Sequence, residues 1–365
     1  MRSTDWSPTH PKHTTKTLLK LTTKNHLKLT TKTLSQNQVS KMFESTNISL
    51  AAKIIQEGGL VAFPTETVYG LGADALNPEA VAKIFAEKER PSFDPLIVHI
   101  ASLEDIPRLT RNVDERVYTL AKRFWPGPLT IVLPKSDIVP DIVTSGLPTV
   151  GIRMPNNPIA LALIKSSGCP IAAPSANKFG RISPTTAQHV RKQLPNVDCI
   201  LDGGPSFVGI ESTVIALNLD GFVILREGFI TADDLKTVLP SSNFPVESGN
   251  KLSSPGLLNS HYSPLKPIFI EGDNSPKSIE FLKNASLHRG AYLSFSGKTP
   301  ESYGVIDYLS KTGDLREAAV NLFGALHSLE DNPQVDFIVS EPVPLREIGI
   351  AIMDRLKKAA YKYKK

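Results

Sequence analysis

Residues 149–177 read TVGIRMPNNPIALALIKSSGCPIAAPSAN, and this stretch indicates the fold class. Its two ends, TVGIRMP and CPIAAPSA, are short β-rich runs punctuated by glycine and proline. The segment between them, NPIALALIKSS, has the composition of a helix. A strand, a helix and a second strand at this density predict an α/β domain.

The same alternation extends in both directions and predicts one α/β domain over residues 46–233. SLAAKIIQEGG (49–59) is expected to be an amphipathic helix that ends at a glycine. Further helices are expected at PEAVAKIFAEKE (78–89), DERVYTLAKRF (114–124) and TTAQHVRKQL (185–194). Further strands are expected at LVAFPT (60–65), PLIVHI (95–100), LTIVLP (129–134), CILDGG (199–204), STVIAL (212–217) and VILREG (223–228).

A second domain follows a stretch of linker composition. Residues 240–264 are rich in Ser, Pro, Gly and Asn, and we place a linker over residues 234–264. Beyond it, strands are expected at KPIFIEG, GAYLSFS and FIVSEP, and helices at SPKSIEFLKNA, DLREAAVNLFGALHSLED and GIAIMDRLKKAAYKY. This alternation predicts a smaller, Rossmann-like three-layer α/β domain with a parallel sheet over residues 265–365.

The first 42 residues differ from the rest of the chain. They hold seven Lys and one Arg against one Asp, a balance of +7, whereas the remaining 33 basic and 35 acidic residues give −2. TTKTLLKL (14–21), TTKNHLKL (22–29) and TTKTLSQN (30–37) repeat every eight residues, a spacing that gives neither a helix nor a strand a clear buried face. A disordered basic tail is the preferred interpretation. A transit peptide and a translation start at Met42 are the alternatives.

Composition and motifs exclude several classes of protein. No run approaches the roughly 18 apolar residues of a membrane span, so no membrane association is expected. Cys169 and Cys199 lie in apolar contexts and can form neither a disulfide framework nor a zinc cluster, which fits a reducing cytoplasm. The glycine-rich dinucleotide and phosphate-binding motifs are absent, and Ser296-Gly297-Lys298-Thr299 lacks the upstream glycine of a phosphate-binding loop and is expected to be a turn.

Polar residues cluster where the predicted strands end. They occur in PTETVYGLG (64–72), EKERPSFDP (87–95), APSANKFGRISP (173–184) and GIEST (209–213), with His99, Arg153 and Arg226 in strands. Each of them alone has an ordinary structural explanation, as a cap, an ion pair or a satisfied core group. Together they supply several cations and hydroxyls without a nucleophile–base pair. That combination suits the binding of a polyphosphate and a carboxylate better than hydrolysis.

An ordered set of phrases resembles the YrdC family, the L-threonylcarbamoyladenylate synthases. The phrases are FPTETVYGLGADA, KERPSFDPLIVHI, WPGPLTIVLP, VGIRMP, APSANKFGRISPT, IESTVIAL and LREG, and they cover about residues 50–233. SPGLLNSHYSP and EIGIAIMDRLKKAA resemble the linker and extra domain of the long, two-domain type. The resemblance implies a twisted mixed α/β sheet with a concave, positively lined surface. It does not extend to the first 42 residues.

The resemblance also implies a reaction. L-Threonine, bicarbonate and ATP would give threonylcarbamoyl-AMP, pyrophosphate and water. The adenylate would serve a threonylcarbamoyl transferase that modifies the adenosine next to the anticodon in tRNAs reading ANN codons. Mg²⁺ is expected with ATP, held by phosphates and water because the sequence shows no dedicated carboxylate cluster. Contact with tRNA or double-stranded RNA is a further expectation, and the expected location is cytoplasmic.

The family's site residues carry over position by position. Threonine contacts are implied at Thr67, His99, Arg153, the backbone of Ala173, and Ser212. ATP contacts are implied at Lys88, Arg90, Asp94, Thr149, Ser175, Asn177, Ser183, Arg226, His261 and Tyr262. Asp94 stands where the family carries Asn, and an anion is awkward beside phosphates. His261 and Tyr262 would close over the nucleotide, and no side chain is implied as a nucleophile or a metal ligand.

Two alternative functions are weighed against synthesis. A concave basic surface could bind tRNA or double-stranded RNA without any reaction, but the domain is near neutral and its Phe93 and Phe179 are isolated aromatics. The linker and second domain could instead form a regulator or a dock for a partner. In that case removing residues 240–365 would leave synthesis intact.

Overall fold

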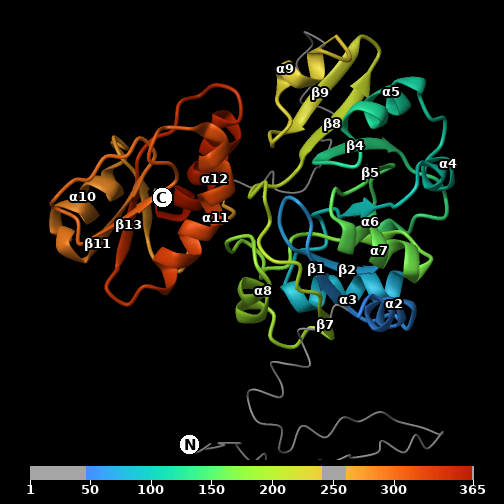
Figure 1. Cartoon of the computed structure of the whole chain (residues 1–365), viewed down its shortest axis with the longest axis horizontal. Helices are drawn as coiled ribbons and strands as arrows, with labels where there is room; N and C mark the ends of the chain where they lie inside the picture. The colour runs from blue at the N-terminus through green and yellow to red at the C-terminus, as the bar shows by residue number, and fades with distance from the viewer. Residues whose placement is uncertain (1–46, 241–259, 364–365) are drawn as a thin grey trace, which may run out of the picture.

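The computed structural model describes residues 47–240 and 260–363, which form two α/β domains (Figure 1). The basic repeat of residues 1–42 and most of the predicted linker lie outside the described residues. The helices of the first domain are α2 (Ile48–Gln56), α3 (Pro78–Lys88), α4 (Ile106–Leu109), α5 (Glu115–Phe124), α6 (Asp141–Thr144), α7 (Pro158–Ser167), α8 (Ala187–Gln193) and α9 (Ala232–Lys236). Its strands are β1 (Val61–Phe63), β2 (Gly70–Asp74), β3 (Ile97–His99), β4 (Leu129–Pro134), β5 (Thr149–Arg153), β6 (Ile171–Ala172), β7 (Cys199–Ile200), β8 (Thr213–Asn218) and β9 (Gly221–Arg226).

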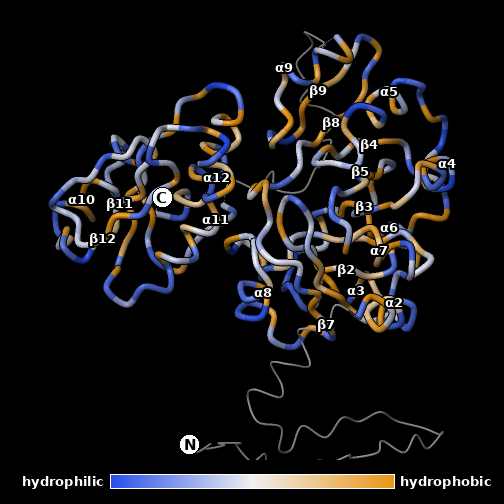
Figure 2. Tube along the Cα trace, viewed as in Figure 1, coloured by the Kyte–Doolittle hydropathy of each residue, from blue (hydrophilic) through white to orange (hydrophobic). Residues whose placement is uncertain are grey.

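The first domain is built on one nine-stranded mixed sheet. The strand order is β7-β1-β2-β6-β3-β5-β4-β8-β9, with parallel pairs between β1 and β7, β3 and β5, and β4 and β8. Hydrophobic segments follow the inner strands, and hydrophilic segments lie in the outer loops (Figure 2). The predicted mixed-sheet α/β fold is therefore confirmed.

Local sequence explains the start and end of α7, the helix of the opening stretch. The Asn157 side chain accepts hydrogen bonds from the backbone N–H groups of Ile159 and Ala160, and Pro158 occupies the first helical position. Gly168 ends the helix in the left-handed conformation at φ 69°. The buried face of α7 packs against α2, which places both helices over the β1 end of the sheet.

Strand β2 was not expected, because its sequence GLGAD is poor in strand-forming residues. The reason for its glycines is close packing. A Cβ built on Gly72 would lie 2.7 Å from the Phe63 ring and 2.7 Å from the Ile171 side chain. Tertiary packing therefore forms this strand where local propensity is low.

The second domain has three layers, as predicted. Its strands are β10 (Ile268–Ile270), β11 (Gly290–Ser294), β12 (Val305–Tyr308) and β13 (Phe337–Ser340), all parallel, in the order β10-β13-β11-β12. Its helices are α10 (Pro276–Asn284), α11 (Leu315–Asp331) and α12 (Gly349–Ala360). One face of the sheet packs with α10, and the other packs with α11 and α12. Strand β12 at the sheet edge was not expected.

Helices α11 and α12 face the first domain (Figure 1). An apolar cluster crosses the boundary, joining Ile182, Val208 and Ile210 of the first domain to Leu322 and Phe323 of α11. This shared core means that the described parts of the two domains pack as one unit rather than as separate bodies.

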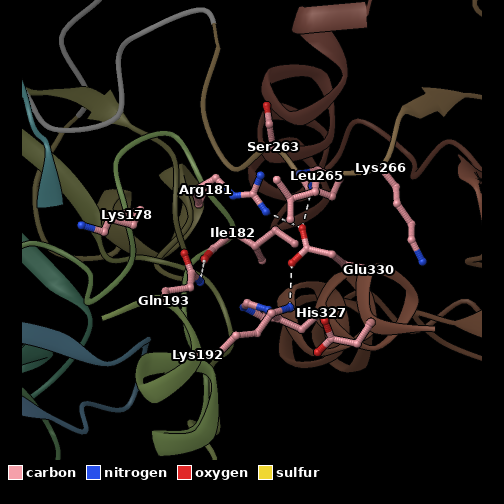
Figure 3. Close-up of polar contacts among 12 residues, drawn as sticks. Lys178, Arg181, Ile182, Lys192, Gln193, Ser263, Leu265, Lys266, His327 and Glu330 are labelled. Carbon is pink, nitrogen blue, oxygen red and sulfur yellow. Dashed lines mark hydrogen bonds and ion pairs between the residues drawn. The ribbon is translucent and has the colours of Figure 1, made fainter. Parts of the chain in front are cut away.

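A buried carboxylate adds a polar anchor to this interface (Figure 3). Glu330 of α11 accepts hydrogen bonds from Arg181 at 2.5 Å and Lys192 at 2.9 Å in the first domain, and from the backbone N–H of Leu265 at 2.6 Å. Glu330 is only 8% exposed, so these three donors compensate a charge that would otherwise be costly to bury. One side chain thus ties the first domain, the start of the second domain and α11 together.

A histidine pair at the interface predicts sensitivity to acid. His189 of α8 and His327 of α11 stack with ring centroids 3.8 Å apart, close to Lys192 and Asp331. Burial lowers the pKa of His189 to about 4 and that of His327 to about 3, so both rings are neutral in the folded protein. The unfolded chain takes up these protons first. The contribution of the two neutral histidines to the free energy of unfolding is therefore complete above about pH 6.5. It is lost as the pH falls toward 4.

The measurement is the thermal unfolding midpoint across that pH range. We expect the midpoint of the wild type to fall more steeply with acid than that of His327→Phe, even if the variant is less stable at neutral pH. Equal slopes for the two proteins would contradict this assignment.

Candidate functional site

A cavity lies where several strands and loops of the first domain end. We call it the central cavity. It is lined by Thr65, Thr67, Val68, Gly70, Arg90, Ile97, His99, Arg153, Ala173, Pro174, Ser175, Glu211, Ser212, Arg226, His261 and Tyr262. All five residues of the expected threonine set line it, as do Arg90, Ser175, Arg226, His261 and Tyr262 of the expected ATP set. The cavity thus combines three guanidinium groups with several hydroxyls.

Arg153 is placed at the cavity by strand β5. The parallel register of β3 and β5 sets Arg153 beside His99. Its Nη2 donates to the Thr67 hydroxyl at 3.0 Å and lies 2.7 Å from the Glu66 carboxylate, whereas its Nε is buried and has no hydrogen-bond partner among the described residues. A buried guanidinium with an unused donor can donate a hydrogen bond to a substrate carboxylate.

His99 stands beside Arg153 as a neutral imidazole. Burial and the nearby positive charge of Arg153 lower the pKa of His99 to about 3. Its Nδ1 is buried and has no hydrogen-bond partner in the described part of the chain, and its ring meets Phe63 edge-on at 6.0 Å. His99 therefore offers a polar ring atom to a ligand without adding a third charge to the Arg153–Glu66 pair.

Ser212 and Arg226 also line the cavity. Arg226, at the end of β9, donates to the Ser212 carbonyl at 3.1 and 2.9 Å and to the Ser212 hydroxyl at 3.1 Å. The same hydroxyl lies 2.8 Å from that of Thr130 on β4. These contacts fix a buried cation and a hydroxyl side by side, an arrangement suited to binding phosphate oxygens.

The structure gives Asp94 a partner. Its carboxylate lies 2.9 Å from Arg90 Nη2, and Arg90 also donates to the carbonyls of Asp94 and Pro95 at 3.1 and 3.0 Å. Asp94 does not line the central cavity, so its charge faces Arg90 rather than the cavity wall. The anion is accommodated as a partner that orients Arg90, and its contact with ATP stays a prediction.

Four other residues of the expected ATP set also lie outside the lining: Lys88, Thr149, Asn177 and Ser183. The Lys88 ammonium donates to the carbonyls of Ser175 and Asn177, and thereby holds the loop that carries Ser175. Asn177 donates within that loop, to the Arg181 carbonyl at 3.1 Å. Thr149 begins β5, at the opposite end from Arg153, and lines a separate small cavity. Direct contact of these residues with ATP remains a prediction.

His261 and Tyr262 come to the cavity from the end of the linker. Tyr262 is 1% exposed and has a backbone φ of 62°, a conformation that non-glycine residues adopt rarely. Its ring packs on Phe323 of α11 at 5.4 Å, and the His261 ring contacts Phe179 at 6.0 Å. The two residues therefore cover the cavity while held between both domains.

Two carboxylates at the site were not assigned from the sequence. Glu66 pairs with Arg153, and Glu211 lines the cavity and accepts a hydrogen bond from Ser183 at 2.6 Å. Both stand in polar phrases already singled out, PTETVYGLG and GIEST, but a sequence does not show which cation a carboxylate faces. Among the described residues, no group of three or more His, Cys, Asp or Glu side chains could hold a metal ion.

Comparisons with known proteins identify the family of this chain. The Sua5/YciO/YrdC family, described as "Telomere recombination", matches residues 53–228, and the "Threonylcarbamoyl-AMP synthase, C-terminal domain" family matches residues 230–361. Threonylcarbamoyl-AMP synthase from Bacillus subtilis is 45% identical, over 87% of this chain and 94% of its own length. The Pyrococcus abyssi enzyme is 44% identical, over 88% and 96%. The crystal structure of P. abyssi Sua5 complexed with L-threonine superposes with a TM-score of 0.76 at 42% identity, over 87% of this chain and 94% of that one.

The two-domain fold and these relatives together define an enzyme of the nucleotidyltransferase type. The family matches identify the class further. The chain belongs to the threonylcarbamoyl-AMP synthases of the Sua5/YrdC family, in their two-domain form. No helix among the described residues is both long enough and apolar enough to span a membrane.

Proposed function

We propose that the central cavity binds L-threonine, bicarbonate and ATP together and forms threonylcarbamoyl-AMP, pyrophosphate and water. The observation that carries this proposal is the convergence of Arg153, Arg90 and Arg226 on one covered cavity beside neutral His99. Three cations can pair with the threonine carboxylate and with part of the negative charge of the triphosphate. A covered cavity protects an adenylate that water would hydrolyse.

Arg153 would hold the threonine carboxylate through its unused Nε, with Thr67 and Ser212 nearby for the amino acid's polar groups. The threonine amine attacks the carbon of bicarbonate, and water leaves to give the carbamate. A carbamate oxygen then attacks the α-phosphorus of ATP, and pyrophosphate leaves. The protein's task in both steps is to position the reactants and to neutralise charge.

Arg90 and Arg226 would neutralise the phosphates, and Ser175 would donate to them from the loop held by Lys88. His261 and Tyr262 would exclude water above the nucleotide. The described residues offer no carboxylate cluster for Mg²⁺, so the ion expected with ATP would be held by phosphates and water.

The proposal includes a place for the product. Threonylcarbamoyl-AMP carries an activated acyl group, and a threonylcarbamoyl transferase acting on the adenosine of ANN-reading tRNAs would consume it. A cytoplasmic location and contact with tRNA or double-stranded RNA belong to this part of the proposal.

The test is pyrophosphate release from ATP by the purified full chain. Release is expected only when threonine and bicarbonate are both present, because the carbamate is the nucleophile. Release that ignores threonine would point to a pyrophosphohydrolase, and no release from folded protein would favour the RNA-binding alternative.

A further inference from the structure

One cation of the second domain reaches the wall of the central cavity. Arg355 lies on α12 and is 1% exposed. Its Nε donates to Glu211 Oε2 at 3.2 Å, and its Nη1 donates to the Glu227 carbonyl at 2.6 Å. Both acceptors belong to the first domain, so Arg355 joins α12 directly to the segments that flank β8 and β9.

The same guanidinium contacts the residue that covers the cavity. The Arg355 Cζ lies 5.7 Å from the centre of the Tyr262 ring, within the range of a cation–π contact. Glu211 and Tyr262 both line the central cavity, although Arg355 itself does not. Glu211 links Arg355 to Ser183, because its other carboxylate oxygen accepts a hydrogen bond from the Ser183 hydroxyl. Arg355 therefore touches two cavity residues from outside.

Stability alone does not explain this arrangement. A buried ion pair is often no more stabilising than apolar groups of the same volume, because both charges must be desolvated. Arg355 is not even fully satisfied, since its Nη2 is buried without a hydrogen-bond partner among the described residues. Burial raises the pKa of Glu211, but the charges of Arg355 and Arg226 outweigh it and hold that pKa below its usual value. Glu211 therefore stays an anion with a fixed orientation.

We propose that Arg355 is a positioning residue for ATP use, acting from the second domain through Glu211 and Tyr262. The inference rests on the proposed function. Ser183 and Tyr262 belong to the expected ATP set. In the described part of the chain, Arg153 bonds to Thr67 and Glu66 and makes no contact with Arg355. Loss of the guanidinium should therefore impair ATP use selectively.

The experiment compares Arg355→Met with Arg289→Met in the full chain. Methionine keeps the apolar stem in both. Arg289 is an exposed residue of the same domain that pairs with Asp336 at 2.5 Å, so it controls for general effects on the domain. We expect Arg355→Met to lower kcat/KM for ATP at least about tenfold and to change the KM for threonine less than about twofold, as for a lost positioning contact. Arg289→Met should match the wild type.

The proposal would be overturned if the Arg355→Met variant used threonine and ATP equally poorly. It would also be overturned if the folded variant showed no fall in kcat/KM for ATP. If Arg355→Met does not fold, Arg355→Lys replaces it, because an ammonium keeps the charge but lacks the two separate donors, Nε and Nη1, that bond to Glu211 and the Glu227 carbonyl. The same selective loss is then expected, and its absence counts against the proposal. Calorimetric titration with ATP alone separates the role of Arg355 from the proposed function. Weaker ATP binding by the variant supports the positioning role of Arg355 even if the wild type fails to release pyrophosphate.

Discussion

Replacing Arg153 by methionine is expected to raise the KM for threonine about a hundredfold while changing the KM for ATP only a few-fold, because hydrogen bonds to a charged group contribute about 1.5–3 kcal/mol. The unused Nε of Arg153 is free to donate to the threonine carboxylate, whereas Arg90 is paired with Asp94. The measurement is pyrophosphate release as a function of threonine and then of ATP.

This substitution has a structural side effect that must be separated from binding. Arg153→Met leaves the Glu66 carboxylate, 1% exposed, without its cation, and an orphaned buried charge costs about 3–5 kcal/mol. The double variant Glu66→Gln/Arg153→Met removes that charge. We expect it to recover most of the lost stability, measured by denaturant unfolding, but none of the threonine affinity.

Recovery of threonine use in the double variant would show that Arg153 serves the fold rather than the substrate. A defect shared equally between threonine and ATP would likewise contradict the assignment. The same logic applies to Arg90, whose replacement should affect ATP first.

The sequence was most informative where polar residues follow apolar strands. His99 and Arg153 end neighbouring strands, Ser212 precedes β8, and Arg226 ends β9. The pattern marked them as polar residues in or beside strands, and the family resemblance assigned them to one site. All of them line the central cavity. The alternation of polar and apolar residues and the position of strand ends are local properties of the sequence. They can therefore be predicted without knowing how distant segments pack.

Pairing across the fold could not be predicted in the same way. Nothing local shows that Glu66 faces Arg153 or that Asp94 turns toward Arg90. Arg355 is the clearest case, because MDRLKKAA reads as an ordinary basic helix and only domain packing buries its guanidinium. Contacts between residues far apart in sequence depend on register and docking, which a single sequence does not state.

Domain docking itself can be tested at one glycine. Gly209 has φ 79°, and a Cβ built there would lie 2.4 Å from the carbonyl oxygens of Ala319 and Val320 in α11. Both are backbone atoms of a helix, so they cannot yield as a flexible side chain would. Gly209→Ala must therefore push α11 away from the first domain, and it would loosen the contacts of Arg355 and Glu330 across the same boundary.

Gly204→Ala is the matched control. Gly204 has φ 75°, but a Cβ there meets nothing within 4 Å. The variant therefore carries the backbone strain of about 1–2 kcal/mol without the collision. We expect Gly209→Ala to lose about a hundredfold in threonine-dependent pyrophosphate release, by displacing positioning groups, and Gly204→Ala to lose little. Limited proteolysis should cut Gly209→Ala faster between the domains.

The comparison also decides between two views of the second domain. If that domain is a regulator or a dock, pushing α11 away leaves synthesis intact, and the two alanine variants behave alike. If it completes the cavity, activity falls with docking, because Tyr262 is packed between Phe323 and the cavity and Glu211 is held by Arg355. The shared apolar cluster and these two contacts favour the second outcome, so the loss in Gly209→Ala should appear in activity as well as in proteolysis.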